Sequence, residues 1–141
     1  MEEQDLNGRL IEVLRKMYGM EVFAQLMEFC QGELRVLLWL DEAASEEQRI
    51  PSVMASAMNV TKGRITAAIA SLKRKGYVVS STPERDRRKL VVSLTEEGSA
   101  YVRQRRKRAV ETVSKFVERI GAERANELIE TLSISISGEA P

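Results

Sequence analysis

Basic side chains gather in the middle of the chain, where they could bind the phosphates of a polyanion. Residues 61–108 contain 14 Lys and Arg and 4 Asp and Glu. Residues 1–60 contain 5 basic and 11 acidic residues, and residues 109–141 contain 3 basic and 6 acidic residues. The formal net charge of +1 therefore hides a basic middle segment between two acidic ones. A segregated basic block is typical of proteins that bind polyanions, and a solvated charged surface is the alternative.

The densest part of this block is the segment ERDRRKLVVSL at residues 84–94. The five residues from Arg85 to Lys89 carry four positive charges and one negative, and a β-branched run follows at once. A similar run, YVVSST, occupies residues 77–82, and the polar stretch between the two opens with Pro83. This spacing predicts a β-hairpin with a longer loop rather than a tight two-residue turn.

A helix is predicted immediately before the hairpin, over residues 61–75. Thr61 is a suitable N-cap, and Gly76 lies where helices commonly end. Helical spacing places four residues on its buried side: Ile65, Ala68, Ile69 and Leu72. A shorter helix is predicted within PSVMASAMNV, residues 51–60, with Ser52 as its N-cap.

Two short helices, a tight turn and a hairpin make a winged helix-turn-helix, whose second helix enters the DNA major groove. Arg64 can bond a guanine edge, and Thr66 can contact a thymine methyl group or a phosphate. Backbone amides at the two helix starts can hold phosphate oxygens. The candidate DNA-binding residues are Ser52, Thr61, Lys62, Gly63, Arg64, Thr66, Ala67, Arg85 and Arg87. The alternative is that Lys62 and Arg64 are solvent-exposed and contact no DNA.

Helices are also predicted on both sides of this motif. Apolar stripes indicate helices over 6–17, 22–29 and 32–44, a long helix from Thr95 to Ile120, and a last one over 122–132. Residues 133–141, SISISGEAP, are expected to be a frayed tail, with a strand as the alternative because apolar and polar residues alternate.

Composition argues against an enzyme and against a membrane protein. The absence of histidine removes Ser-His and Cys-His pairs and His-ligated metal sites, so neither a metal nor another cofactor is expected. No apolar run approaches the ~18–20 residues of a membrane span, and MEEQDLNGRL lacks the apolar region of a signal peptide. With one cysteine and no internal disulfide, a cytoplasmic location is expected. A lysine- or carboxylate-based enzyme and a pure protein-interaction module stay as alternatives.

These motifs, in this order, resemble the MarR family of transcriptional regulators over nearly the whole chain. The family's wing has the pattern D-x-R-D-x-R, then a hydrophobic strand, then L-T-x-x-G. Here the corresponding segments read PERDRR, KLVVSL and LTEEG. Arg85, Asp86, Arg88 and the LTxxG match, whereas Pro83 replaces the first acidic residue and Ala67 stands where the family often has a basic one.

The resemblance implies a mostly α fold of about six helices with a small β-hairpin wing, in a single domain over 1–141. Residues 33–95 would form the winged helix-turn-helix lobe, and residues 1–30 and 96–135 would supply dimerisation helices. The implied function is a homodimeric repressor of a pseudo-palindromic double-stranded DNA operator. Six residues would form the dimer interface, unless they pack within one subunit: Leu6, Leu10, Leu14, Leu128, Ile129 and Leu132.

Within the wing, the charged residues are expected to have different roles. Arg87 is the candidate for insertion into the minor groove, where a narrow groove attracts arginine. Asp86 is expected to brace the loop by pairing with Arg85 or Arg88. Five further basic residues lie within 103–108 and are expected to form a solvated face toward the acidic flanks, with phosphate contact as the alternative.

Two features suggest a signal that releases DNA. Cys30 precedes a predicted helix start in the Ser/Thr position of a capping box, where a reactive thiolate would be favoured. Cys30 is therefore interpreted either as a redox sensor or as a small, partly buried side chain without a sensing role. The family also binds small aromatic anions, and the candidate pocket walls, or alternatively core residues, are Met17, Tyr18, Met20, Phe23, Met27 and Trp39.

Overall fold

A computed structural model describes residues 2–138. Within this range the chain forms seven α-helices, one 3-10 turn and one antiparallel hairpin, so the predicted fold class is confirmed with seven helices rather than about six. The elements are α1 (Glu2–Met17), α2 (Glu21–Cys30), α3 (Gly32–Glu42), η1 (Glu47–Arg49), α4 (Pro51–Ala57), α5 (Lys62–Arg74), β1 (Val78–Ser81), β2 (Val91–Leu94), α6 (Glu96–Ile120) and α7 (Ala122–Ser137).

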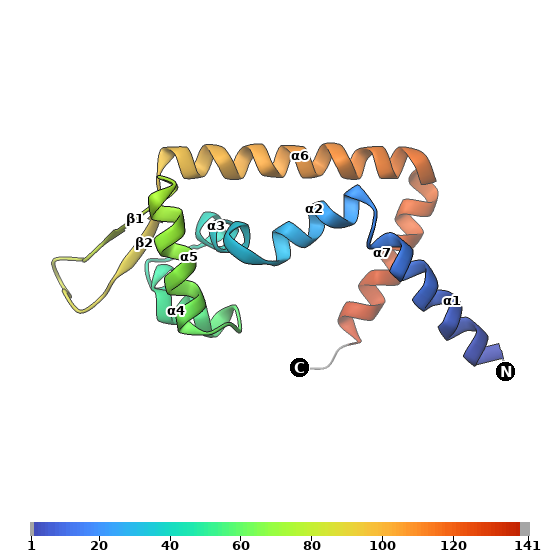
Figure 1. Ribbon diagram of the computed structural model, residues 1–141, viewed down its shortest axis with the longest axis horizontal. Helices are drawn as coiled ribbons and strands as arrows, with labels where there is room; N and C mark the ends of the chain where they lie inside the picture. Colours follow the sequence, from blue (N-terminus) through green and yellow to red (C-terminus); the bar gives the residue numbers. More distant parts are fainter. Residues whose placement is uncertain (1, 139–141) are drawn as a thin grey trace.

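Helix α6 spans the long dimension of the molecule and carries different elements at its two ends (Figure 1). The lobe of α3, α4, α5 and the hairpin lies under its N-terminal end, while α1 and α7 lie near the other end. Helix α3 is central to the lobe and contacts α2, α5, α6 and β2. The most deeply buried large side chains belong to this lobe and to the start of α6: Leu37, Met54, Ile65, Leu72, Val92 and Val102.

The hairpin has the longer loop that the sequence predicts. Its register pairs Val78 with Leu94 and Ser81 with Val91, which leaves residues 82–90 as the loop. Two backbone hydrogen bonds shape that loop: the Asp86 N–H donates to the Pro83 carbonyl at 3.2 Å, and the Lys89 N–H donates to the Asp86 carbonyl at 3.2 Å.

The LTxxG segment fastens α6 to the start of the hairpin. The Thr95 hydroxyl accepts a hydrogen bond from the Gly98 N–H at 3.0 Å and donates one to the Gly76 carbonyl at 2.6 Å, while the Thr95 N–H donates to the Tyr77 carbonyl at 3.0 Å. Gly98 is buried so closely that a Cβ atom there would lie 2.1 Å from the Tyr77 carbonyl oxygen. Hydrogen bonding therefore uses the hydroxyl at position 95, and the lack of space calls for glycine at position 98.

The prediction of a frayed tail after residue 132 is wrong for the residues that the structure describes. Helix α7 continues to Ser137, and residues 139–141 lie outside the described range. Adding a turn to a formed helix needs no new nucleation, so the alternating Ile and Ser residues follow the helix before them. The hydroxyls of Ser133 and Ser137 donate to the carbonyls four residues earlier, at 2.6 and 2.7 Å.

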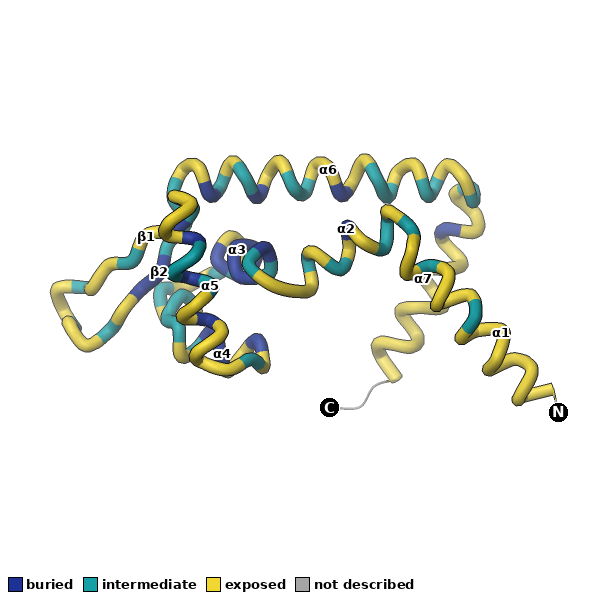
Figure 2. Tube along the Cα trace, in the orientation of Figure 1, coloured by how far each residue is buried: buried dark blue, intermediate teal, exposed yellow. Residues whose placement is uncertain are grey.

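Helices α1 and α7 are exposed along most of their length (Figure 2). They carry apolar side chains that this chain does not cover. The predicted stripes are exposed: Leu6 60%, Leu10 56%, Leu14 53%, Leu128 38%, Ile129 61% and Leu132 54%. The alternative that they pack within one subunit is therefore wrong. Among residues 2–138, no helix combines the length and the apolar character needed to cross a bilayer.

Candidate nucleic-acid interface

The turn between α4 and α5 is held by a side chain that sequence patterns did not single out. Asn59 adopts a φ of 54°, and the Val60 N–H donates to the Ala55 carbonyl at 3.0 Å. From α3, Arg35 donates to the Met58 carbonyl at 2.8 Å. Because Arg35 is 23 residues away from Met58, only the folded arrangement shows that α3 is hydrogen-bonded to the turn between the two helices.

Helix α5 faces solvent with the residues predicted for DNA contact. The Thr61 hydroxyl caps it by accepting from the Arg64 N–H at 3.2 Å, and Ile65, Ile69 and Leu72 bury its inner side. Five residues of the first two turns are exposed: Lys62, Gly63, Arg64, Thr66 and Ala67. The Thr66 hydroxyl donates to the Lys62 carbonyl at 2.9 Å, so its oxygen is left as an acceptor.

The prediction that Ser52 caps α4 is wrong. Pro51 occupies the first position of α4, and Ile50 is the N-cap, with no side-chain cap hydrogen bond. Proline suits a first helical position because its φ is already helical and the missing N–H has no partner there. Ser52 is therefore the second helical residue, and it is exposed on the same side as the start of α5.

A groove of about 530 Å³ brings α4, α5 and the hairpin loop together. Its polar walls are Ser52, Lys62, Thr66, Lys73, Arg88 and Lys89. Four of these six are cationic, and they come from α5 and from the wing loop. The predicted helix and the predicted wing thus line one positively charged depression.

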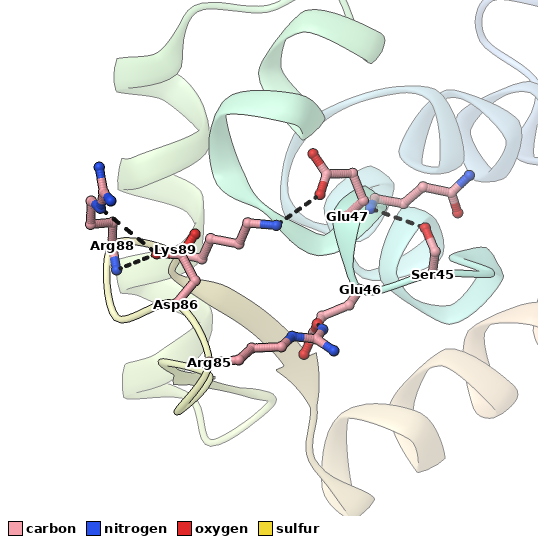
Figure 3. A network of polar contacts seen from close by, with 8 residues as sticks. Ser45, Glu46, Glu47, Arg85, Asp86, Arg88 and Lys89 are labelled. Carbon is pink, nitrogen blue, oxygen red and sulfur yellow. Dashed lines mark hydrogen bonds and ion pairs between the residues drawn. The ribbon is translucent and has the colours of Figure 1, made fainter.

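The charged residues of the wing are paired in a specific way (Figure 3). Asp86 accepts a hydrogen bond from the Arg88 N–H at 3.1 Å, and the same carboxylate oxygen lies 4.0 Å from the Arg88 Nε. Arg85 turns away from Asp86 and pairs with Glu46, and Lys89 Nζ lies 3.4 Å from a Glu47 carboxylate oxygen. Of the two partners expected for Asp86, the structure therefore pairs it with Arg88.

The basic cluster at 103–108 is partly neutralised by acidic residues of the N-terminal half. Arg105 pairs with Glu28, and Arg106 lies 3.3 Å from Asp41 and 3.0 Å from Glu42. The cluster thus faces the acidic flanks as expected, but the Arg105 side chain is only 16% exposed, so that part of the face is not solvated. The other basic residues of the cluster are exposed: Arg103, Lys107 and Arg108.

An ion pair fastens the end of α5 to the start of α3. The Lys75 Nζ lies 2.5 Å from a Glu33 carboxylate oxygen. The hydrogen bond from Lys75 lowers the pKa of Glu33 from its ordinary value of 4.5, and the same bond raises the pKa of Lys75 above 10.5. Each residue therefore favours the charged form of the other.

Comparison with known proteins decides the family. A MarR family model matches residues 31–89, which include α3, α4, α5 and most of the hairpin loop. The chain is 31% identical over 96 residues to the HTH-type transcriptional repressor YetL of Bacillus subtilis (strain 168). This chain belongs to the MarR family. The aligned region covers 67% of the chain and spans 57% of the length of YetL.

Solved MarR-like structures share the fold of this family member. A mutant of S. aureus MepR has a TM-score of 0.73 at 17% identity, with 94% of this chain and 98% of that chain covered. CouR bound to a 23-mer DNA duplex has a TM-score of 0.66 at 20% identity, with 96% and 95% covered. CouR of Rhodococcus jostii RHA1 has also been solved with p-coumaroyl-CoA, with a TM-score of 0.61, 23% identity, and 98% and 96% covered.

Cys30 of this MarR-family chain does not occupy the predicted capping position. It is the last residue of α2, and Gln31 is the N-cap of α3, with no side-chain cap hydrogen bond. Gly32 adopts a φ of +66° and the backbone reverses there, so the capping-box pattern was misaligned by one residue. The Cys30 thiol is exposed, which overturns the interpretation of a partly buried side chain.

Among residues 2–138, two of the six candidate walls of a ligand pocket line cavities, and these two cavities are separate. Met20 lines a hollow of about 170 Å³ with Phe116, and Trp39 lines another of about 340 Å³ with Phe29, Arg35 and Arg106. Tyr18 and Phe23 pack against each other with ring centres 5.5 Å apart. Within the part of the chain described here, no three residues of the His, Cys, Asp and Glu types form a group that could hold a metal ion.

Proposed function

We propose that this MarR-family chain is a DNA-binding transcriptional regulator, and that it acts as a homodimeric repressor of a pseudo-palindromic operator. One observation carries the proposal: Lys62 and Thr66 from the exposed first two turns of α5 line a single groove together with Arg88 and Lys89 from the end of the hairpin loop. A recognition helix and a wing must reach the duplex together. The groove between them carries the charge that phosphates require.

In the proposed complex the start of α5 enters the major groove. Arg64 would read a guanine edge through two hydrogen bonds, and Lys62 and Lys73 would bind phosphates on either side. Arg87 is exposed in the wing loop and would enter the adjacent minor groove. Among the described residues, no carboxylate pairs with Lys62, Arg64 or Arg87, so these three cations are available to DNA.

The homodimer is supported by the surface that the single chain exposes. Its accessible area is 10623 Å², whereas a compact monomer of 15.9 kDa exposes about 7,400 Å². The excess of roughly 3,000 Å² is on the scale that obligate interfaces bury. We assign residues 33–95 to the DNA-binding lobe and residues 1–30 and 96–135 to dimerisation, since α1 and α7 carry the uncovered leucine and isoleucine side chains.

A chemical signal that releases DNA is the remaining part of the proposal. CouR, a structural neighbour, has been solved with p-coumaroyl-CoA, and a small aromatic ligand is the corresponding class for this chain. The hollow beside Trp39 is lined by two aromatic rings and two arginines, and an anion bound there would compete with Asp41 and Glu42 for Arg106. The exposed Cys30 thiol is the candidate for an oxidative signal, since oxidants reach it directly.

The site assignment is tested by three arginine-to-alanine variants with a fluorescent duplex from upstream of the chain's own gene. Arg64→Ala should weaken binding to this duplex far more than binding to an unrelated duplex, because a base contact carries sequence information. Arg87→Ala should weaken binding to both. Arg124→Ala, an exposed arginine of α7 outside the DNA-binding lobe and outside the uncovered leucine and isoleucine stripe, should change neither, with analytical ultracentrifugation showing that its dimer is intact. If Arg64→Ala and Arg87→Ala bind as the unsubstituted protein does, the assigned surface is wrong.

A further inference from the structure

Two consecutive glutamates at the start of η1, its N-cap Glu46 and its first residue Glu47, pair with two of the four cations in the wing. We propose that Glu46 and Glu47 are internal counter-ions, which withhold Arg85 and Lys89 from DNA phosphates and so set the affinity and salt dependence of binding. The proposal rests on the DNA-binding function above. It assigns a role in that function to two acidic residues outside both the recognition helix and the wing.

The pairing divides the wing cations into two kinds (Figure 3). Arg85, near the start of the loop, reaches Glu46 across 39 residues of sequence, and Lys89, near its end, reaches Glu47 across 42. Arg87 and Arg88 lie between them in the sequence, and the Arg88 side chain is 98% exposed. The two ends of the loop are therefore neutralised by Glu46 and Glu47, whereas at its centre Arg88 pairs with Asp86 of the loop itself and Arg87 has no ion pair among the described residues.

The glutamates are mounted on a segment that the fold holds in place. The Trp39 Nε1 donates to the Gln48 carbonyl at 2.7 Å, which fastens η1 to α3. Arg49 donates to the Ser93 hydroxyl at 3.0 Å, which fastens η1 to β2. The Ala44 N–H donates to the Gln48 side-chain oxygen at 2.7 Å, which closes the connection from α3. Glu46 and Glu47 thus meet the wing from a fixed position.

The effect on salt dependence follows from counting ions. A cation that neutralises a phosphate releases a counterion from DNA, which steepens the dependence of log K on log salt by about 0.9. If Arg85 stays with Glu46, it releases none. If Arg85 moves to a phosphate, Glu46 loses its partner and takes up a cation from solution, so the net release is again close to zero. In either case Arg85 and Lys89 add nothing to the slope of log K against log salt.

The test removes each counter-ion without changing its shape. Glu46→Gln should bind duplex DNA more tightly and with a slope steeper by about 0.9 for each wing, and Glu47→Gln should do the same. At 0.1 M salt this corresponds to about an eightfold gain for each cation released, if the term vanishes at 1 M salt. The gain should be equal for operator and unrelated DNA, because phosphate contacts carry no sequence information.

Two comparisons separate this role from a general charge effect. Glu84→Gln removes the same charge from the wing itself. Because Glu84 forms no ion pair among the described residues, this change releases no cation and should tighten binding less. In an Arg85→Gln background, Glu46→Gln should have almost no further effect, because the cation that it releases is gone. The inference is overturned if Glu46→Gln acts no more strongly than Glu84→Gln, or equally with and without Arg85. Failure of the unsubstituted protein to bind DNA would instead refute the proposed function.

Discussion

Replacing Gly98 by alanine should destabilise the protein through one identifiable contact. A Cβ atom at this position would lie 2.1 Å from the Tyr77 carbonyl oxygen and 2.9 Å from the carbonyl carbon. Both atoms belong to the backbone, so no side-chain rotation relieves the clash. Helix α6 and the start of β1 must separate by about 1 Å or more to reach an ordinary contact distance near 3.4 Å.

The separation acts on a junction with little freedom. Thr95 bonds both Gly76 and Tyr77 there, at 2.6 and 3.0 Å, and a shift of this size breaks at least one of those hydrogen bonds. Overpacking a close contact costs about 1–3 kcal/mol, and a lost hydrogen bond costs about 0.5–1.5 kcal/mol. The expected loss of unfolding free energy is about 2–4 kcal/mol, which corresponds to a fall in Tm of roughly 7–13 °C for a chain of this length.

The assay is thermal unfolding followed by circular dichroism, at one fixed protein concentration because dimerisation contributes to Tm. Gly63→Ala is the matched control: a Cβ atom there meets no heavy atom within 4 Å, so the change should leave Tm unchanged or raise it slightly. Equal Tm values for Gly98→Ala and Gly63→Ala would refute the close-contact argument.

Three further predictions address the dimer, the α3–α5 ion pair and the thiol. Leu10→Glu should shift the protein toward monomer in analytical ultracentrifugation, because it places charge in the uncovered stripe of α1. Leu90→Glu in the wing should leave the dimer intact. A dimer unchanged by Leu10→Glu would exclude α1 from the interface. Because the pKa of Glu33 lies below 4.5, its pairing with Lys75 stabilises the fold above that pH and is lost as pH falls through the lowered value. Glu33→Gln should therefore flatten the decline of Tm below pH 4.5, and an equally steep decline in both proteins would contradict this. Peroxide should weaken DNA binding of the unsubstituted protein and not of Cys30→Ser; the same response in both proteins would remove the thiol as a sensor.

Features that depend on neighbouring residues could be predicted from the sequence. The Thr61 cap, the buried stripe of α5, the long hairpin loop and the end of α6 at Gly121 all follow from spacing, turn chemistry and cap preferences. The exposed side of α5 follows from the same periodicity, so most of the residues of the candidate DNA surface could be predicted from the sequence.

Features that depend on distant residues could not be predicted. Arg35 holding the turn at Met58, and the pairing of Glu46 with Arg85, join segments 23 and 39 residues apart that no local pattern connects. Local signals also misled at three places: Pro51 displaced the expected cap at Ser52, and the reversal at Gly32 put Cys30 at the end of a helix. The third was the alternating tail, which continued as helix because α7 was already formed before it.

The central claim is that the surface of α5 and the wing binds duplex DNA through its phosphates and selects sequence through its bases. The most direct measurement is fluorescence anisotropy with a labelled duplex from upstream of the chain's own gene, over about 50 to 200 mM salt, beside an unrelated duplex. The account predicts that log K falls linearly and steeply with log salt, and that the upstream duplex binds more tightly at every salt concentration. Binding that does not depend on salt, or no binding at the lowest salt, would contradict it.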